Sequence, residues 1–222
     1  AQSKTINSSG KLIVNAEDNT FSNNKMGFGV GAGLGAAAGA NINLYYSDNL
    51  VQAEILSNSG GLINADSSEI SSKTTGGLDN LNVGVAAGLV GIAGDVVVIK
   101  MGQSADYTSS ETASGVKTAN DRVKNIYNFE TPSKTETGSI SRVNGNLKTT
   151  NNTDIKAESK IKGKGDTLEL KNVDVTAGLG TGSVAVRDIQ LNNNTIAEIT
   201  GGEVESTSGK ISLNAQNTSN ID

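Results

Sequence analysis

A short phrase of small and aliphatic residues occurs three times in this chain and limits what the chain can fold into. Each copy is followed by a second phrase, in which alanine precedes an acidic residue and then isoleucine or tyrosine. An internal repeat of this kind is the signature of structural units that stack on one another. The copies are Val30-Gly31-Ala32-Gly33-Leu34 with Ala53-Glu54-Ile55, Val85-Ala86-Ala87-Gly88-Leu89 with Ala105-Asp106-Tyr107, and Val175-Thr176-Ala177-Gly178-Leu179 with Ala197-Glu198-Ile199.

The first copy lies in a stretch, residues 26–46, with strict alternation of residue type. Even positions carry methionine, aromatic and aliphatic residues, whereas odd positions carry mainly glycine and asparagine. A period of two places the two sets on opposite faces of a strand, and a helix would mix them. Each glycine would also cost a helix about 0.5–1 kcal/mol relative to alanine. The stretch is therefore predicted to be extended, and to bend because an ordinary strand has only about 5–6 residues.

The aliphatic set of this alternation is expected to face the protein core, because burying aliphatic side chains is the main stabilising contribution to folding. An aspartate at one of these positions, such as Ala87, would then be a buried unpaired charge and strongly destabilising. The residues predicted to face inward are Val30, Ala32, Leu34, Val85, Ala87, Leu89, Val175, Ala177 and Leu179.

Stacking of these units predicts an all-β chain with the architecture of a right-handed parallel β-helix, or β-solenoid. No single unit can bury its own apolar face, so successive units must cover one another. Crossover chirality favours the right-handed form. The 27 glycines, the single proline and the 3% aromatic content fit a thin aliphatic core better than a sandwich of this length. Residues 1–222 are read as one domain, cut from a longer array because the phrase at 9–16 recurs at 208–215.

One part of the chain departs from the repeat and predicts a short helical insertion. The second copy of the phrase follows the first after 55 residues and the third follows after 90, an excess of 35. Within residues 111–130 apolar positions recur at helical spacing, with charged residues on the other side. The insertion is predicted at about 111–165. Its helix either packs against the flank or binds a partner, and the candidate partner-binding residues are Val116, Arg122, Val123, Ile126 and Tyr127.

Taken together, the glycine-alanine-valine phrase, the asparagine-rich turns, the Ala-Glu-Ile strand and Ser208-Gly209-Lys210-Ile211-Ser212-Leu213-Asn214-Ala215 carry a resemblance. The chain resembles two-partner-secretion exoproteins of the filamentous-haemagglutinin type, and within that family its leukotoxin-like members. The resemblance covers most of the chain apart from about 111–165. It implies a right-handed β-helical rod that is secreted or displayed on a Gram-negative surface.

The same resemblance implies partners. They are the surface of host cells, leukocytes or epithelial cells, and an outer-membrane secretion partner that binds a region outside this sequence. It leaves two functions open, a cytotoxin segment that perturbs leukocyte membranes and a structural or adhesive rod of a filamentous adhesin or autotransporter. The chain is expected to be monomeric. A net charge of −5 gives no basic footprint for nucleic acid.

No catalytic, cofactor or metal site is expected. The chain has no histidine, the commonest general base and metal ligand, and no cysteine. Asp48, Asp66, Asp79, Asp95 and Asp106 occur singly, and a glycosidase or lyase site needs clustered carboxylates or a metal. Stacking could still bring some of them together, so the enzyme remains the third and least favoured hypothesis.

Two features of the glycine-rich stretch have alternative interpretations that we disfavour. Gly31-x-Gly33-x-x-Ala36 partly matches a dinucleotide fingerprint, but that motif needs a helix directly after its glycines. The stretch is also uncharged over about 20 residues, the length of a membrane-spanning helix. Its period of two and its glycine content argue against insertion as a helix.

Overall fold

The computed structural model describes residues 4–22, 27–47, 49–57, 60–102, 138–162, 170–192 and 194–220. In these residues the regular elements are strands, and they contain no helix. The strands follow one another in groups of five. They are β1 (Thr5–Asn7), β2 (Lys11–Ser22), β3 (Gly27–Ala32), β4 (Ala36–Ser47), β5 (Leu50–Leu56); β6 (Leu62–Ala65), β7 (Ser67–Leu78), β8 (Asn80–Ala87), β9 (Val90–Gly102), β10 (Gly138–Asn144); β11 (Asn146–Thr149), β12 (Thr153–Ile161), β13 (Leu170–Ala177), β14 (Gly180–Asn192), β15 (Asn194–Gly201); β16 (Val204–Ser206) and β17 (Ile211–Ser219).

Every strand pairs in parallel with the strand five places along the chain. This gives five sheets, with strand orders β1-β6-β11-β16, β5-β10-β15, β2-β7-β12-β17, β3-β8-β13 and β4-β9-β14. One group of five strands is called a coil here, and successive coils lie directly on one another. The prediction of an all-β chain with parallel sheets is confirmed, and the arrangement is compatible with a β-solenoid.

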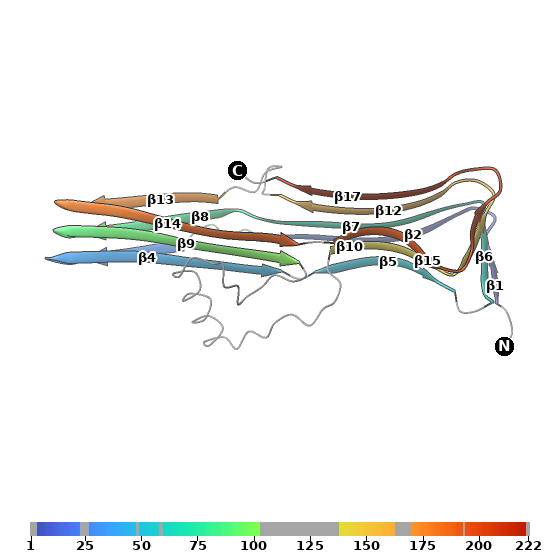
Figure 1. Cartoon of the computed structure of the whole chain (residues 1–222), viewed down its shortest axis with the longest axis horizontal. Coiled ribbons are helices and arrows are strands. Elements are labelled where there is room, and N and C mark those ends of the chain that lie inside the picture. Colours follow the sequence, from blue (N-terminus) through green and yellow to red (C-terminus); the bar gives the residue numbers. More distant parts are fainter. Residues whose placement is uncertain are drawn as a thin grey trace.

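Each coil is a long, flattened loop, and its two halves differ (Figure 1). The half called the body contains β1, β2, β5, β6, β7, β10, β11, β12, β15, β16 and β17. The half called the blade contains two sheets, β3-β8-β13 and β4-β9-β14, joined by tight turns at its free end. These turns, residues 33–35, 88–89 and 178–179, form the tip of the blade.

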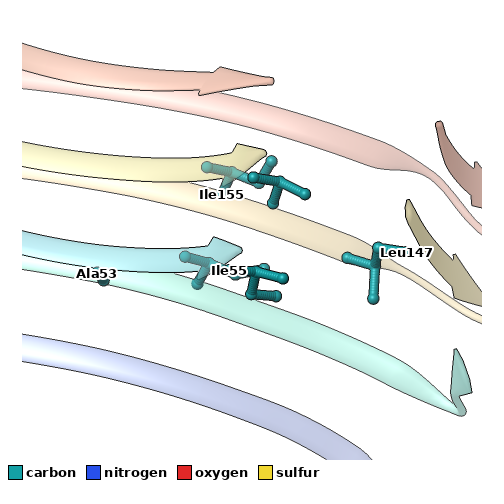
Figure 2. Close-up of a cluster of buried hydrophobic side chains, with 6 residues drawn as sticks. Ala53, Ile55, Leu147 and Ile155 are labelled. Atoms are coloured by element: carbon teal, nitrogen blue, oxygen red, sulfur yellow. The ribbon is translucent and has the colours of Figure 1, made fainter. Parts of the chain in front are cut away.

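The core of the body is aliphatic and is built from equivalent positions of successive coils. Figure 2 shows Ala53, Ile55, Leu147 and Ile155 among its buried side chains, which the structure completes with Ile70 and Val143. Ile70 and Ile155 have no exposed surface. Burying a side chain of this size contributes about 1.5–3 kcal/mol, so this stack supplies much of the stability of the body.

Next to the tip, the interior of the blade is made of glycine and alanine, which makes the predicted inward face wrong. Ala86 and Ala93 are fully buried, whereas Val30 is 59% exposed and Leu34 is 100% exposed. The two sheets are too close for larger side chains, because a Cβ on Gly29 would lie 2.5 Å from the Ala40 carbonyl oxygen. The aliphatic set therefore faces outward. Of the nine residues predicted to be inward, Val85 is half-buried and Val30, Ala32, Leu34, Ala87, Leu89, Val175, Ala177 and Leu179 are exposed.

The strand pairing also narrows the predicted insertion. Residues 138–162, inside the predicted range of 111–165, form β10, β11 and β12, which pair with the coils on both sides. Ser141-Arg142-Val143 of β10 aligns with the Ala-Glu-Ile phrases of β5 and β15 and takes the place predicted for residues 105–107. The segment between β9 and β10 is 103–137. The predicted helix lies in that segment, outside the described residues.

Candidate functional site

The candidate partner-binding residues Val116, Arg122, Val123, Ile126 and Tyr127 lie in 103–137, outside the described residues. Among the residues that the structure describes, the most unusual chemistry is a cluster of polar side chains inside the blade. The cluster comprises Asn41 on β4, Asn82 on β8, Asp95 on β9 and Asp174 on β13. We call it the blade carboxyl cluster.

Sheet register and the blade turns bring the cluster together. Asn41 pairs with Asp95 in one sheet, and Asp174 pairs with Gly84 in the other. The Asp174 carboxylate points over Gly84, where its Oδ1 would lie 2.5 Å from an added Cβ. The tip turn between β8 and β9 is Gly88-Leu89. Asn82 lies six residues before this turn and Asp95 six residues after it, so they face one another across the blade.

Asn41, Asn82 and Asp95 are buried and incompletely hydrogen-bonded, whereas Asp174 on the third coil is half-buried. Asp95 is 1% exposed and Asn82 is fully buried. Both carboxylate oxygens of Asp95 and the amide nitrogens of Asn41 and Asn82 have no partner with hydrogen-bond geometry. The Asn82 Oδ1 accepts a hydrogen bond from the Asn43 amide. An ionised carboxylate in such a place is costly because nothing replaces its hydration.

The pKa of Asp95 reflects this environment. Burial away from water and the neighbouring carboxylate of Asp174 raise the pKa of Asp95 to about 6, and the amide of Asn41 opposes the shift. The negative charge of the Asp174 carboxylate thus adds to the cost of ionising Asp95.

This arrangement cannot process a polymeric substrate. A glycosidase needs two carboxyl groups that reach the scissile bond, and Asp95 is closed off between two sheets. The described residues contain no group of three or more histidine, cysteine, aspartate or glutamate side chains that could hold a metal ion. The burial of Asp95 thus keeps its carboxyl group out of reach of a polymeric substrate.

Of the other aspartates named from the sequence, Asp66 lies apart from this cluster. Asp66 lies in the body and accepts a hydrogen bond from the Asn151 amide at 2.9 Å. Asp48 and Asp106 are outside the described residues. The glycine fingerprint is followed by a strand, since β4 begins at Ala36, so the helix that a dinucleotide site requires is missing there.

A second cluster of charges crosses three coils of the body. Arg142 lies between Glu54 and Glu198 in the register of the sheet. Its Nε donates to the Glu198 Oε1 at 2.5 Å, and its Nη1 lies 3.9 Å from the Glu54 Oε1. The side chains of Arg142 and Glu54 are each only 18% exposed. One guanidinium thus neutralises two stacked carboxylates that would otherwise repel.

Replacing Arg142 by alanine should lower the free energy of unfolding by about 1–2 kcal/mol, because two poorly hydrated carboxylates lose their shared cation. The matched control is Lys148→Ala, which removes a pair with Glu205 whose partners are both 46% exposed. That change should lower the free energy of unfolding by no more than about 0.5 kcal/mol. Urea unfolding of both variants measures the two losses in the free energy of unfolding. Equal losses would show that the cluster of Arg142, Glu54 and Glu198 stabilises the body no more than an exposed ion pair does.

The described residues contain no helix with the length and hydropathy that crossing a bilayer requires. Comparison of the chain with protein-family models, with curated proteins and with solved structures found no match in any of the three.

Proposed function

We propose that this chain is a segment of a large secreted bacterial exoprotein, leukotoxin-like in type, and that it forms a right-handed parallel β-helical rod that acts on host cells. The observation that carries the proposal is the stacking of five-strand coils in register. Val30, Val85 and Val175, from the three copies of the repeated phrase, occupy one ladder position. Repeat sequence and repeat structure thus have the same period, as a rod built by addition of coils requires.

The body shows how further coils would add. Leu213 of β17 pairs with Ile155 of β12. Ile155 lies between two coils and is fully buried, whereas Leu213 is 48% exposed. One more coil on this sheet would cover Leu213 as β17 helps to cover Ile155. In this proposal the rod is secreted or held at a Gram-negative surface, with a secretion partner that binds a region outside this sequence.

A second candidate is a purely structural or adhesive rod of a filamentous adhesin or autotransporter. The rows of lysine and glutamate on the body favour it. Lys11 contacts Glu69 at 2.5 Å, and Lys156 lies 3.9 Å from the same carboxylate. Such exposed pairs make a solvated, repetitive surface, which suits a spacer or a broad adhesive face.

Purified chain labelled with a fluorophore tests host-cell action by flow cytometry on leukocytes and epithelial cells. Saturable binding to either cell type supports the proposal, and loss of membrane integrity in leukocytes selects the cytotoxin over the adhesive rod. Binding no greater than that of a labelled unrelated β-rich protein would rule out host-cell action by this segment. The hand of the coil is tested separately, by an experimental structure.

A further inference from the structure

The outer surface of the blade is apolar in three directions. On the β3-β8-β13 sheet, Val30 and Val175 are 59% and 51% exposed, and on the β4-β9-β14 sheet, Ile92 and Val184 are 50% and 57% exposed. The tip carries one leucine per coil, namely Leu34, Leu89 and Leu179, with 100%, 56% and 93% of their surface exposed. Val30, Val85 and Val175 share one ladder position on the β3-β8-β13 sheet, and Ile92 and Val184 lie two positions apart on the paired strands β9 and β14. Contiguous apolar surface of this kind marks an interaction site.

In the part of the chain that the structure describes, no fully exposed charged residue lies near the tip, and the nearest partly exposed one is the half-buried Asp174. In the third coil the nearest exposed charged residues are Lys171 and Arg187, each eight residues from Leu179. At about 3.3 Å per residue they lie about 26 Å from the tip along the strands. The carboxylates nearer the tip, Asp95 and Asp174, belong to the internal cluster. An uncharged surface complements an uncharged phase rather than a charged polymer.

The turns at the tip bond their backbones to one another between coils. The Gly33 amide donates to the Ala87 carbonyl, and the Gly88 amide donates to the Ala177 carbonyl, both at 3.0 Å. The Leu179 amide donates to the Leu89 carbonyl at 3.0 Å. These groups can leave water without losing hydrogen bonds, which is the condition for entering an apolar phase.

We propose that the leucine tip of the blade inserts shallowly into the lipid of a neutral bilayer. A second copy packed on one sheet would leave the opposite sheet and the tip exposed, whereas fluid acyl chains surround a thin wedge on both faces and at its end. The edge strands of the first and third coils limit the depth, because unpaired backbone groups are costly in hydrocarbon. Contact is therefore confined to the turns and the residues next to them. This inference does not depend on the proposed function.

Tryptophan fluorescence tests the proposal on the whole chain. The chain has no tryptophan, so Leu89→Trp places a single reporter at the tip. Phosphatidylcholine vesicles should shift its emission to the blue, and brominated acyl chains should quench it. Ile13→Trp on β2 is the matched control, because Ile13 is 61% exposed but lies in the body, and it should show neither effect.

A second variant removes the apolar tip. The triple change Leu34→Ser, Leu89→Ser and Leu179→Ser alters exposed side chains only and should fold normally by circular dichroism. Co-sedimentation with phosphatidylcholine vesicles should fall by at least about a hundredfold in partition coefficient, because each leucine contributes through its apolar area.

Three results would overturn the inference. The first is the absence of a vesicle-induced shift in Leu89→Trp. The second is a blue shift that depends on protein concentration without lipid, which would assign the blade to a second copy of the chain. The third is binding to anionic vesicles only, undiminished in the triple serine variant, which would show electrostatic adsorption elsewhere.

Discussion

Replacing Ala86 by aspartate should unfold the blade, whereas the same replacement at Ala87 should be tolerated. Ala86 is fully buried between the two blade sheets, and its carbonyl lies 3.0 Å from where a Cβ on Gly91 would be. An aspartate there has neither space nor water, so we expect a loss of several kcal/mol in the free energy of unfolding. Ala87 is the next residue on the same strand and points to solvent.

Thermal and urea unfolding of the two variants provide the measurement. The pair is closely matched, because the same charge is added to the same strand one residue apart. Ala87→Asp should stay within about 0.5 kcal/mol of the unmodified chain, as surface changes usually do. The reverse ranking would mean that the aliphatic set faces inward after all.

The alternation along residues 26–46 predicted extended structure correctly, but not which side is buried. A period of two defines two faces and leaves open which of them meets the neighbouring sheet. Aliphatic residues usually face inward when sheets are about 10 Å apart. Here the backbones next to the tip are much closer, and a Cβ on Gly29 or Gly31 would clash with the opposite strand. The run of glycines at odd positions was the available signal, since closely approaching backbones require residues without bulk.

Repeat matching found the equivalent positions of the first phrase, but it misplaced the second phrase at residues 105–107, where Ser141-Arg142-Val143 stands instead. The phrase beginning at Lys11 and its copy beginning at Lys210 lie in one sheet, linked through β7 and β12 at equivalent positions. The strands at 138–162 were missed as part of the array because many of their buried positions are polar. Ser139 and Ser141 are fully buried, and both donate to the Ser72 hydroxyl at 2.8 Å. Buried serine weakens the hydrophobic period, so these strands gave only weak signals and were assigned to the insertion.

The blade carboxyl cluster was only partly accessible to sequence reasoning. Folding the second repeat at Leu89 places Asn82 opposite Asp95, which residue counting could have found. Asp174 is brought in by the stacking of the third coil, and its approach to Asp95 depends on the small distance between the sheets. That distance follows from the glycine packing, which the sequence analysis had assigned to the wrong face.

Lowering the pH from 7.5 to 5 should stabilise the chain through Asp95. The pKa of Asp95 in the folded chain is about 6, above its ordinary value of 3.8, so the folded state binds the proton more tightly. The resulting stabilisation is fully present below pH 3.8 and is lost as the pH rises through 6. Its upper limit is about 3 kcal/mol, from about 1.4 kcal/mol per pH unit.

Asp95→Asn isolates this contribution from the other titrating groups. The groups that face Asp95 are Asp174 on β13, Asn41 on β4 and Asn82 on β8, and the nearest cation on β14, Arg187, is exposed. Glu69 changes the stability in the opposite direction. Its hydrogen bond from Lys11 lowers the pKa of Glu69, so this stabilisation is lost as the pH falls. Both chains contain Glu69, so its contribution cancels when the free energy of unfolding of the variant is compared with that of the unmodified chain at each pH.

The variant should be more stable than the unmodified chain at pH 7.5, because a neutral amide can donate to Asp174 without the cost of a buried charge. Since the unmodified chain gains its proton in acid, the two stabilities should converge toward pH 5. The exposed residue Glu203 supplies the control, and Glu203→Gln should follow the unmodified chain at every pH. Urea unfolding at pH 5, 6 and 7.5 measures the free energy of unfolding of the three chains. A constant difference between Asp95→Asn and the unmodified chain would mean that Asp95 does not titrate in this range, and that the blade interior holds its carboxylate charged.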